Sequence, residues 1–261
     1  MNEDTSTARG ATPMTTVDSI PRVTRAEAAR LAADEYARGL DQLRSLGPDD
    51  WTRPTECTLW DVRAMAGHSV GMMGDFGSFR SLMGRMRAAT KEQKRSGAVF
   101  VDVMTGMQVA ALVQLTVPQL VACAEENAPR AVRFRSGANG LFRKMPMKEE
   151  VGGEPETWRM GYLLDTILTR DPWMHRVDIA RATGRDLVLT PGHDGRIVAD
   201  VVAEWARRHG KPFVLSLTGP AGGEYVAGDG GERISLDAVE FCRILSGRAE
   251  GTGLLTRPVP F

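Results

Sequence analysis

The sequence predicts a mostly helical protein, in which a long helical region is followed by a small α/β region. Before residue 211, apolar residues recur at helical spacing over long segments, which is the pattern of amphipathic helices. After residue 211, short apolar runs alternate with glycine-rich turns, which is typical of strands joined by hairpins. The chain has 261 residues, of which 42% are hydrophobic and 25% charged, so it has the composition of a globular protein and enough length for two such regions.

Residues 1–22 are predicted to form a flexible N-terminal arm. They are rich in Thr, Ser, Asp and Gly and carry little apolar periodicity, so they have too few apolar side chains to form a core. We therefore expect the helical domain to span residues 23–190 and the small α/β domain to span residues 191–261.

Two helices with clear start signals open the helical domain. The first spans Arg25–Leu46, and Thr24 precedes it as a predicted N-cap. The second is predicted to begin at the cap residue Thr58, to contain His68 and to continue with interruptions towards Thr90.

Two more long helices follow a polar, basic linker. One spans Val99–Asn127 and is predicted to end at Pro129. Residues 129–155 then read as a long connection, and the next helix spans Thr157–Gly184 with the glycine as its C-cap. The basic side chains of the connection suit an anionic substrate or, more commonly, a solvated surface. They are Arg130, Arg133, Arg135, Arg143 and Lys144.

The last third of the chain predicts one helix, three short strands and a closing helix. The first helix spans Gly195–His209 and ends at a glycine. Apolar runs at 213–217, 224–227 and 233–235 are predicted strands, because glycine-rich turns separate them. Residues 237–245 are predicted to form the closing helix.

Charge and hydropathy argue against several classes of partner. Acidic and basic residues balance at 33 each, so nothing favours nucleic acid or a charged membrane surface. No apolar run approaches the roughly 20 residues that span a bilayer, and the N-terminus lacks the apolar core of a secretion signal. A cytoplasmic location is the resulting expectation.

The cysteines do not predict a disulfide framework or a thiolate zinc site. Cys57, Cys123 and Cys242 are odd in number and far apart, and the chain has no CxxC pair. Burial as small apolar side chains is the commoner role for such cysteines.

The helix predicted over Thr157–Gly184 holds the strongest candidate site. Asp171 lies four residues before His175, and Asp178 lies three residues after it, so all three side chains fall on one helical face. An imidazole flanked by carboxylates suits a mixed nitrogen and oxygen site for zinc or a similar ion. His68, in another long helix, is the natural further ligand in a bundle.

Each of these residues also has a structural explanation that the sequence leaves open. Asp171 before Pro172 is a good N-cap for a restarted helix. Asp178 is a candidate ligand, a second-shell partner of the histidine or the partner of a surface arginine. His175 would also fit as a hydrogen-bonded core histidine.

Three stretches of the sequence resemble the mycothiol-dependent maleylpyruvate isomerase family, which is related to the DinB-like bundles. Residues 51–68 read WxxPTxCxxWDVRxMxxH, and residues 169–184 read TRDxWMHRVDIAxAxG. Residues 236–248, LDAxEFCRxLSGR, are similar to the small C-terminal domain of many members. The two histidine motifs together are fairly specific, whereas either alone would be weak.

The resemblance implies a DinB-like up-and-down four-helix bundle with a metal site, followed by a small α/β C-terminal domain. The family's ligands fall on His68, Asp171 and His175. The isomerase itself carries a glutamate at the position of Asp171, so the side chain here is one methylene shorter. Pro172 follows it, and Asp178 stays open as a further ligand or second-shell residue.

By the same resemblance, we expect an enzyme that uses zinc or another divalent metal. Its co-substrate would be a low-molecular-weight thiol such as mycothiol, and it would catalyse isomerisation or S-transfer on a small electrophile. The expected partners are that thiol and that substrate, with a homodimer as one option for the oligomeric state. The alternative is a non-catalytic metal-binding or regulatory protein on the same bundle. The sequence assigns no catalytic or cofactor-binding residue beyond the metal ligands.

Overall fold

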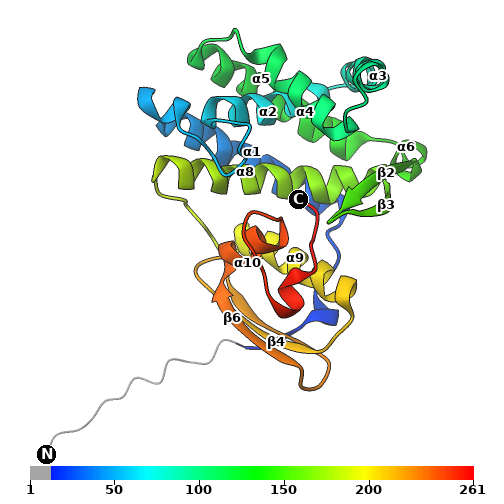
Figure 1. Cartoon of the computed structure of the whole chain (residues 1–261), viewed down its shortest axis with the longest axis vertical. Coiled ribbons are helices and arrows are strands. Elements are labelled where there is room, and N and C mark those ends of the chain that lie inside the picture. The colour runs from blue at the N-terminus through cyan, green and yellow to red at the C-terminus, as the bar shows by residue number, and fades with distance from the viewer. Residues whose placement is uncertain (1–12) are drawn as a thin grey trace, which may run out of the picture. The chain divides into compact units, whose positions relative to one another are not determined.

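The structure is a computed structural model that describes residues 13–261, and it confirms the predicted fold class (Figure 1). The described chain divides into two compact units. One comprises Val23–Val188 with Pro260–Phe261 and is almost entirely helical. The other comprises Leu189–Val259 with the described residues up to Arg22 and combines helices with a sheet.

Four helices form the core of the helical unit. They are α1 (Arg25–Ser45), α2 (Val62–Asp75), α5 (Val117–Gly137) and α8 (Leu168–Thr183). Helix α1 packs against α5 and α8, and α2 packs against the same two helices, so the four close into a bundle (Figure 1). Apolar side chains from all four fill its interior, and this burial is the main force that holds the helices together.

Two further helices lie outside this core. Helix α4 (Phe100–Leu112) packs against α2, and α3 (Phe79–Ser96) packs against α4. The stretch predicted to continue with interruptions towards Thr90 is two helices, α2 and α3. The prediction of one helix over Val99–Asn127 is wrong, because that segment is split between α4 and α5. Local caps explain the breaks. Ser78 Oγ accepts from the N–H of Ser81 at the start of α3, and Thr116 with a following proline opens α5.

The first two helices have well-defined starts. Thr24 caps α1, as predicted, by accepting from the N–H of Glu27 at 3.2 Å. Helix α2 is capped by Asp61 rather than Thr58, because Asp61 Oδ1 accepts from the N–H of Ala64 at 2.7 Å. A short 3₁₀-helix, η2 (Pro48–Thr52), lies between α1 and α2.

The prediction of a long connection over residues 129–155 is wrong. Helix α5 continues through Pro129, which lies on its exposed face where water can reach the carbonyl left without a donor. A short helix, α6 (Gly140–Lys144), follows. An antiparallel hairpin comes next, formed by β2 (Pro146–Val151) and β3 (Glu154–Arg159). The helix predicted to begin at Thr157 therefore starts later.

Helix α8 is preceded by α7 (Met160–Tyr162) and a π-helical turn (Leu163–Ile167), and it runs without a break through Pro172. The proposed N-cap role of Asp171 is wrong, since this residue lies inside the helix. Pro172 cannot donate to the carbonyl of Leu168. Buried Arg135 supplies the missing donors, through Nη1 to that carbonyl at 2.9 Å and through Nε to the carbonyl of Leu164 at 2.8 Å.

The second unit contains helix α9 (Asp194–His209), strands β4 (Phe213–Thr218), β5 (Gly223–Ala227) and β6 (Glu232–Asp237), helix α10 (Ala238–Leu245) and the short helix η4 (Gly253–Thr256). The sheet order is β1-β5-β4-β6, in which β1 is Thr15–Thr16. Strand β5 is antiparallel to β4, and β6 is parallel to it. Trp205 packs against Phe213 and Phe241 in the core, with ring centroids 4.7 and 5.3 Å away.

The N-terminal arm predicted over residues 1–22 is only partly within the described chain, because residues 1–12 lie outside it. From Thr15 on, the prediction is wrong. Strand β1 (Thr15–Thr16) pairs with β5, and the short helix η1 (Val17–Ser19) follows with Val17 buried. Backbone pairing and one buried valine hold this segment, and neither leaves a periodic sequence signal.

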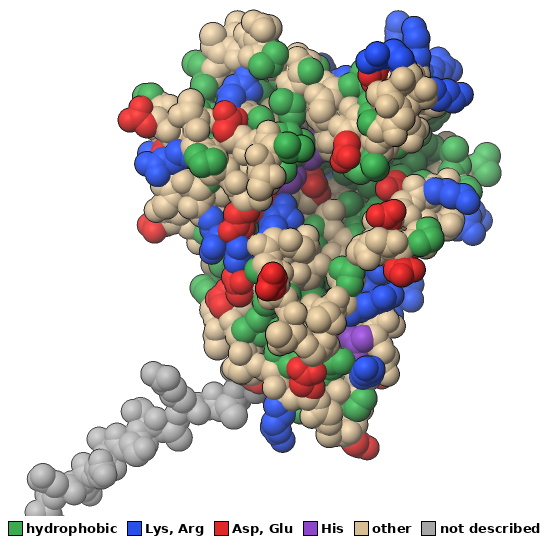
Figure 2. Space-filling view, in the orientation of Figure 1, with side chains coloured by type: hydrophobic (Ala, Val, Ile, Leu, Met, Phe, Trp, Pro, Cys, Tyr) green, Lys and Arg blue, Asp and Glu red, His purple; other side chains and the backbone are tan. Residues whose placement is uncertain are grey.

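The surface agrees with the balanced composition. Figure 2 shows Lys and Arg gathered over α3, whereas both signs of charge are interspersed over much of the same face. Among the described residues, no helix is both long enough and apolar enough to span a membrane.

Candidate metal centre

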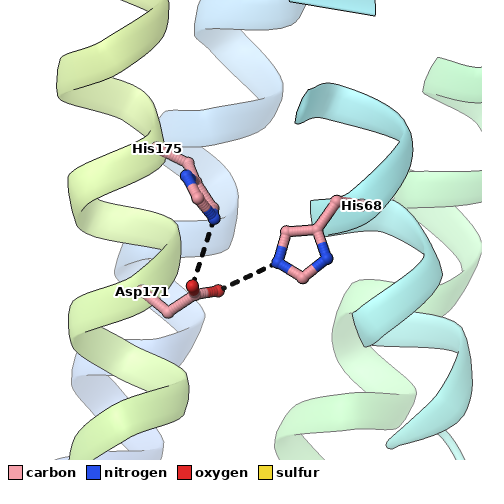
Figure 3. A group of neighbouring side chains, drawn as sticks. All are labelled: His68, Asp171 and His175. Atoms are coloured by element: carbon pink, nitrogen blue, oxygen red, sulfur yellow. Dashed lines mark ion pairs between the residues drawn. The ribbon is translucent and has the colours of Figure 1, made fainter. Parts of the chain in front are cut away.

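Three predicted ligands from two bundle helices meet at one point. His68 comes from α2, and Asp171 and His175 lie one turn apart on α8. The carboxylate of Asp171 lies between the two rings (Figure 3), with Oδ2 3.5 Å from His68 Nε2 and Oδ1 3.1 Å from His175 Nε2. One donor atom from each residue lies within 4.8 Å of the others, which is close enough to converge on a single ion.

The site is buried except on the side of Asp171. His68 and His175 are 5% and 7% exposed, whereas the side chain of Asp171 is 23% exposed. Burial acts to raise the pKa of Asp171, but the adjacent imidazoles of His175 and His68 outweigh it and hold that pKa well below its ordinary value. The aspartate is therefore a carboxylate at neutral pH, as a metal ligand must be.

Asp178 contacts the other side of His175. Its Oδ2 lies 3.2 Å from His175 Nδ1, and the residue is fully buried. A carboxylate at this position accepts from Nδ1–H, so in the neutral ring the lone pair lies on Nε2, which faces Asp171. Of the roles that the sequence left open for Asp178, this geometry favours that of a carboxylate that orients the ring of His175 over that of a ligand or a surface ion pair.

His68 is held in a similar way by a residue that the sequence reasoning missed. Its Nδ1 lies 2.8 Å from Oε1 of Gln108 on α4, and Gln108 is 3% exposed. The amide of Gln108 donates in turn to Asp75 Oδ2 at 2.8 Å. One signal was available, since Gln108 is a lone amide among the largely apolar residues of the helix FVDVMTGMQVAAL.

Trp60 lies beside both histidines. Its ring centroid is 4.9 Å from that of His68 and 6.3 Å from that of His175. The indole comes from the loop just before α2, and it was part of the first histidine motif without a role of its own. It supplies an apolar wall next to the three donors, which favours strong electrostatic interactions there by reducing contact with water.

The side chains present fit a divalent metal ion. Two imidazoles and one carboxylate are a common donor set for zinc. The Nε2 atom of His175 is buried, and no described residue gives it a hydrogen bond of acceptable geometry, although Asp171 lies 3.1 Å away. When His175 is neutral and protonated on Nδ1, its Nε2 lone pair faces the carboxylate of Asp171, and an ion between the two would bind both.

Three of the five basic residues that suited an anionic substrate are held by other groups of the protein. Arg135 is buried inside the bundle, where it donates hydrogen bonds to two backbone carbonyls. Arg143 forms an ion pair with Asp165. Arg130 pairs with Glu126 on the surface of α5. Arg133 and Lys144 are exposed to solvent, which fits a solvated surface.

A model of one protein family, described as the mycothiol maleylpyruvate isomerase N-terminal domain, matches residues 32–180. This is more than half of the chain and includes all three converging side chains. The chain belongs to this family. The suspected membership is thereby confirmed, and the match covers the bundle rather than the small α/β unit.

Two solved structures have a similar fold. One is the mycothiol-dependent maleylpyruvate isomerase, with a TM-score of 0.54 and 17% identity, and the match covers 90% of this chain and 93% of that one. The other is a histidine-to-alanine mutant of the mycothiol-dependent maleylpyruvate isomerase, with a TM-score of 0.51, 18% identity and the same coverage. No curated protein matches the chain. At such low identity the likeness shows the fold and not the reaction.

The metal-free protein should lose stability as the pH rises from 6.5 to 9. Burial acts to lower the pKa of His175, but Asp171 and Asp178 outweigh it and raise that pKa from 6.5 to about 9. Protonated His175 therefore stabilises the fold fully below pH 6.5, and this contribution is lost as the pH rises through 9. Thermal unfolding in a chelator should show a falling melting temperature, and His175→Gln should flatten the profile. Identical pH profiles for both proteins would contradict this expectation.

Proposed function

We propose that the chain is a metal-dependent enzyme that uses a low-molecular-weight thiol such as mycothiol. Zinc is the expected metal, and the reaction is isomerisation or S-transfer on a small electrophilic substrate. One observation carries the proposal, namely the convergence of donor atoms from His68, Asp171 and His175 within 4.8 Å of one another. Membership of the family and the likeness to a mycothiol-dependent maleylpyruvate isomerase support it.

The residues would hold the metal with three protein ligands. Such a site leaves one coordination position open, which is the pattern of catalytic rather than structural zinc sites. An ion held there would lower the pKa of a bound thiol, and the thiolate is the nucleophilic form. The exposed side of Asp171 is the direction from which small molecules would approach.

The surrounding side chains prepare the ligands for this role. Asp178 and Gln108 face the Nδ1 atoms of His175 and His68, so both rings present Nε2 towards Asp171. The carboxylate of Asp171 supplies one negative charge against the two of the ion. Trp60 covers the two histidines with an apolar ring and limits access of water.

A calorimetric titration with mycothiol tests the proposal. The purified protein should contain about one equivalent of zinc, as its metal content will show. The zinc-loaded protein should bind mycothiol, because the thiol can occupy the open coordination position of the zinc ion. The chelator-treated protein has no zinc ion and should not bind mycothiol. Mycothiol with its sulfur methylated is the matched control ligand and should bind more weakly.

Two results would contradict the enzyme proposal. Stoichiometric zinc without thiol binding would favour the non-catalytic metal-binding or regulatory protein. Equal binding of mycothiol to the zinc-loaded and chelator-treated proteins would show that the thiol does not engage the metal.

A further inference from the structure

Gln108 reaches the metal centre from outside the four-helix core. It lies on α4, which packs against α2, the helix that carries His68. Its amide oxygen Oε1 is 2.8 Å from Nδ1 of His68, and its amide nitrogen Nε2 is 2.8 Å from Oδ2 of Asp75. Both neighbours are buried, with exposed fractions of 5%, so water does not compete for either bond.

Asp75 determines which way the amide of Gln108 faces. A carboxylate only accepts hydrogen bonds, so the nitrogen of the amide must point towards Asp75 and the oxygen towards His68. An amide oxygen also only accepts, and therefore Nδ1 of His68 must carry the proton. In the neutral ring the lone pair then lies on Nε2, which is the atom nearest to Asp171.

Arg85 fixes the far end of this chain of hydrogen bonds. Its Nε donates to both carboxylate oxygens of Asp75, at 3.0 and 3.1 Å, and its Nη1 donates to the carbonyl of Met107. Burial acts to raise the pKa of Asp75, while the bonds from Gln108 and Arg85 oppose that rise. The arginine thus supplies a positive charge next to a buried carboxylate that would otherwise be costly.

A glycine on α2 permits the close approach of Gln108. A Cβ atom at Gly71 would lie 2.8 Å from Cβ of Gln108 and 3.1 Å from its Cα. Any other residue at position 71 would therefore push α4 away from α2 and lengthen the bond to His68. The close packing of Gly71 against Gln108 and the hydrogen bond from His68 to Gln108 therefore depend on the same short distance between α2 and α4.

We propose that Gln108, Asp75 and Arg85 form a positioning chain that sets the tautomer and ring orientation of His68 for metal binding. The inference rests on the proposed metal site. It gives helices α3 and α4, which lie outside the bundle core, a part in the metal centre. Outer hydrogen bonds of this kind raise the basicity of a ligating imidazole and hold its ring in place, and their loss weakens metal binding about 10–100-fold.

The test compares zinc affinity, measured by competition with a chromophoric chelator, among variants of the whole protein. Gln108→Leu removes both hydrogen bonds and should weaken zinc binding about 10–100-fold. Gln114→Leu, at an exposed glutamine just after α4, is the matched control and should leave affinity unchanged. Melting temperatures, recorded alongside, separate a loss of folding from a loss of positioning.

A swap of the two groups provides the rescue. Gln108→Glu alone places two carboxylates side by side and should weaken zinc binding. Adding Asp75→Asn should restore it, because the new glutamate still accepts from His68 and also accepts from the new asparagine amide. Asp75→Asn alone should have a mild effect, since the asparagine oxygen can still accept from Gln108.

Nitrogen-15 NMR of labelled histidine gives a second readout that a merely structural role would not move. In the zinc-loaded protein, Nδ1 of His68 should carry a slowly exchanging proton, and Gln108→Leu should expose that proton to exchange. Wild-type zinc affinity in Gln108→Leu, or a lowered melting temperature alone, would overturn the positioning chain and leave the metal site standing. Failure of the wild-type protein to bind zinc would overturn the proposed function, and this inference with it.

Discussion

His175→Ala is expected to weaken zinc binding by more than about 100-fold, beyond the range that outer-shell changes produce. The substitution removes one of three donors and leaves Asp171 with a single imidazole neighbour, His68, at 3.5 Å. It also leaves the fully buried Asp178 without its bond to Nδ1, so the free energy of unfolding should fall as well. Zinc content after dialysis and competition with a chelator measure the affinity.

The matched control is His209→Gln. His209 lies in the other unit, at the end of α9, where its Nδ1 accepts from the N–H of Lys211 at 3.0 Å. A glutamine oxygen can accept the same bond, and zinc content should stay at the wild-type level. If His175→Ala retained wild-type affinity while remaining folded, the assignment of this histidine as a ligand would be wrong.

Arg135→Met is expected to lower the free energy of unfolding by about 3–5 kcal/mol. Losses of this size are typical of substitutions that break a buried network of hydrogen bonds. Arg135 is 2% exposed and donates to the carbonyls of Leu164 and Leu168. It also donates to Tyr36 Oη at 2.9 Å and to Thr169 Oγ1 at 2.7 Å. Methionine fills a similar volume but leaves these acceptors without the hydrogen bonds from Arg135. Urea unfolding followed by circular dichroism measures the change in the free energy of unfolding.

A coupling experiment links this loss to Pro172. The carbonyl of Leu168 needs Arg135 because proline four residues later has no N–H. Pro172→Ala returns a donor to that carbonyl, so it should offset part of the damage of Arg135→Met, by about 1 kcal/mol in a double-mutant cycle. Arg133→Met, at an exposed position of the same helix, should cost little. Equal stability of the Arg135 and Arg133 variants would contradict this account of the helix.

The fold class was predictable because the hydrophobic periods differ so clearly between the two halves of the chain. The boundaries of helices and strands were harder to predict from the sequence where tertiary contacts override local signals. A proline usually ends a helix. Helix α5 nevertheless continues through Pro129, because this proline lies on the exposed face of the helix. Likewise, α8 passes through Pro172, where Arg135, far away in the sequence, donates to the carbonyl that the proline leaves without a donor.

The candidate ligands were accessible from the sequence because two motifs placed them on helices of a bundle. The structure brings His68, Asp171 and His175 together, and their role as metal ligands stays a prediction. The lone amide of Gln108 in a largely apolar helix was visible in the sequence, but its partner was not, because the contact with His68 depends on α4 packing over Gly71. The role of Asp178 likewise depended on which ring nitrogen it contacts.

X-ray absorption spectroscopy of the zinc-loaded protein, without added thiol, tests the central claim most directly. We expect one zinc ion with nitrogen and oxygen neighbours at about 2.0–2.1 Å, and outer-shell scattering from two imidazole rings, those of His68 and His175. The imidazole signal should shrink to one ring in His68→Ala. A sulfur neighbour at about 2.3 Å, the distance of a cysteine ligand, or a zinc ion without imidazole scattering, would contradict it.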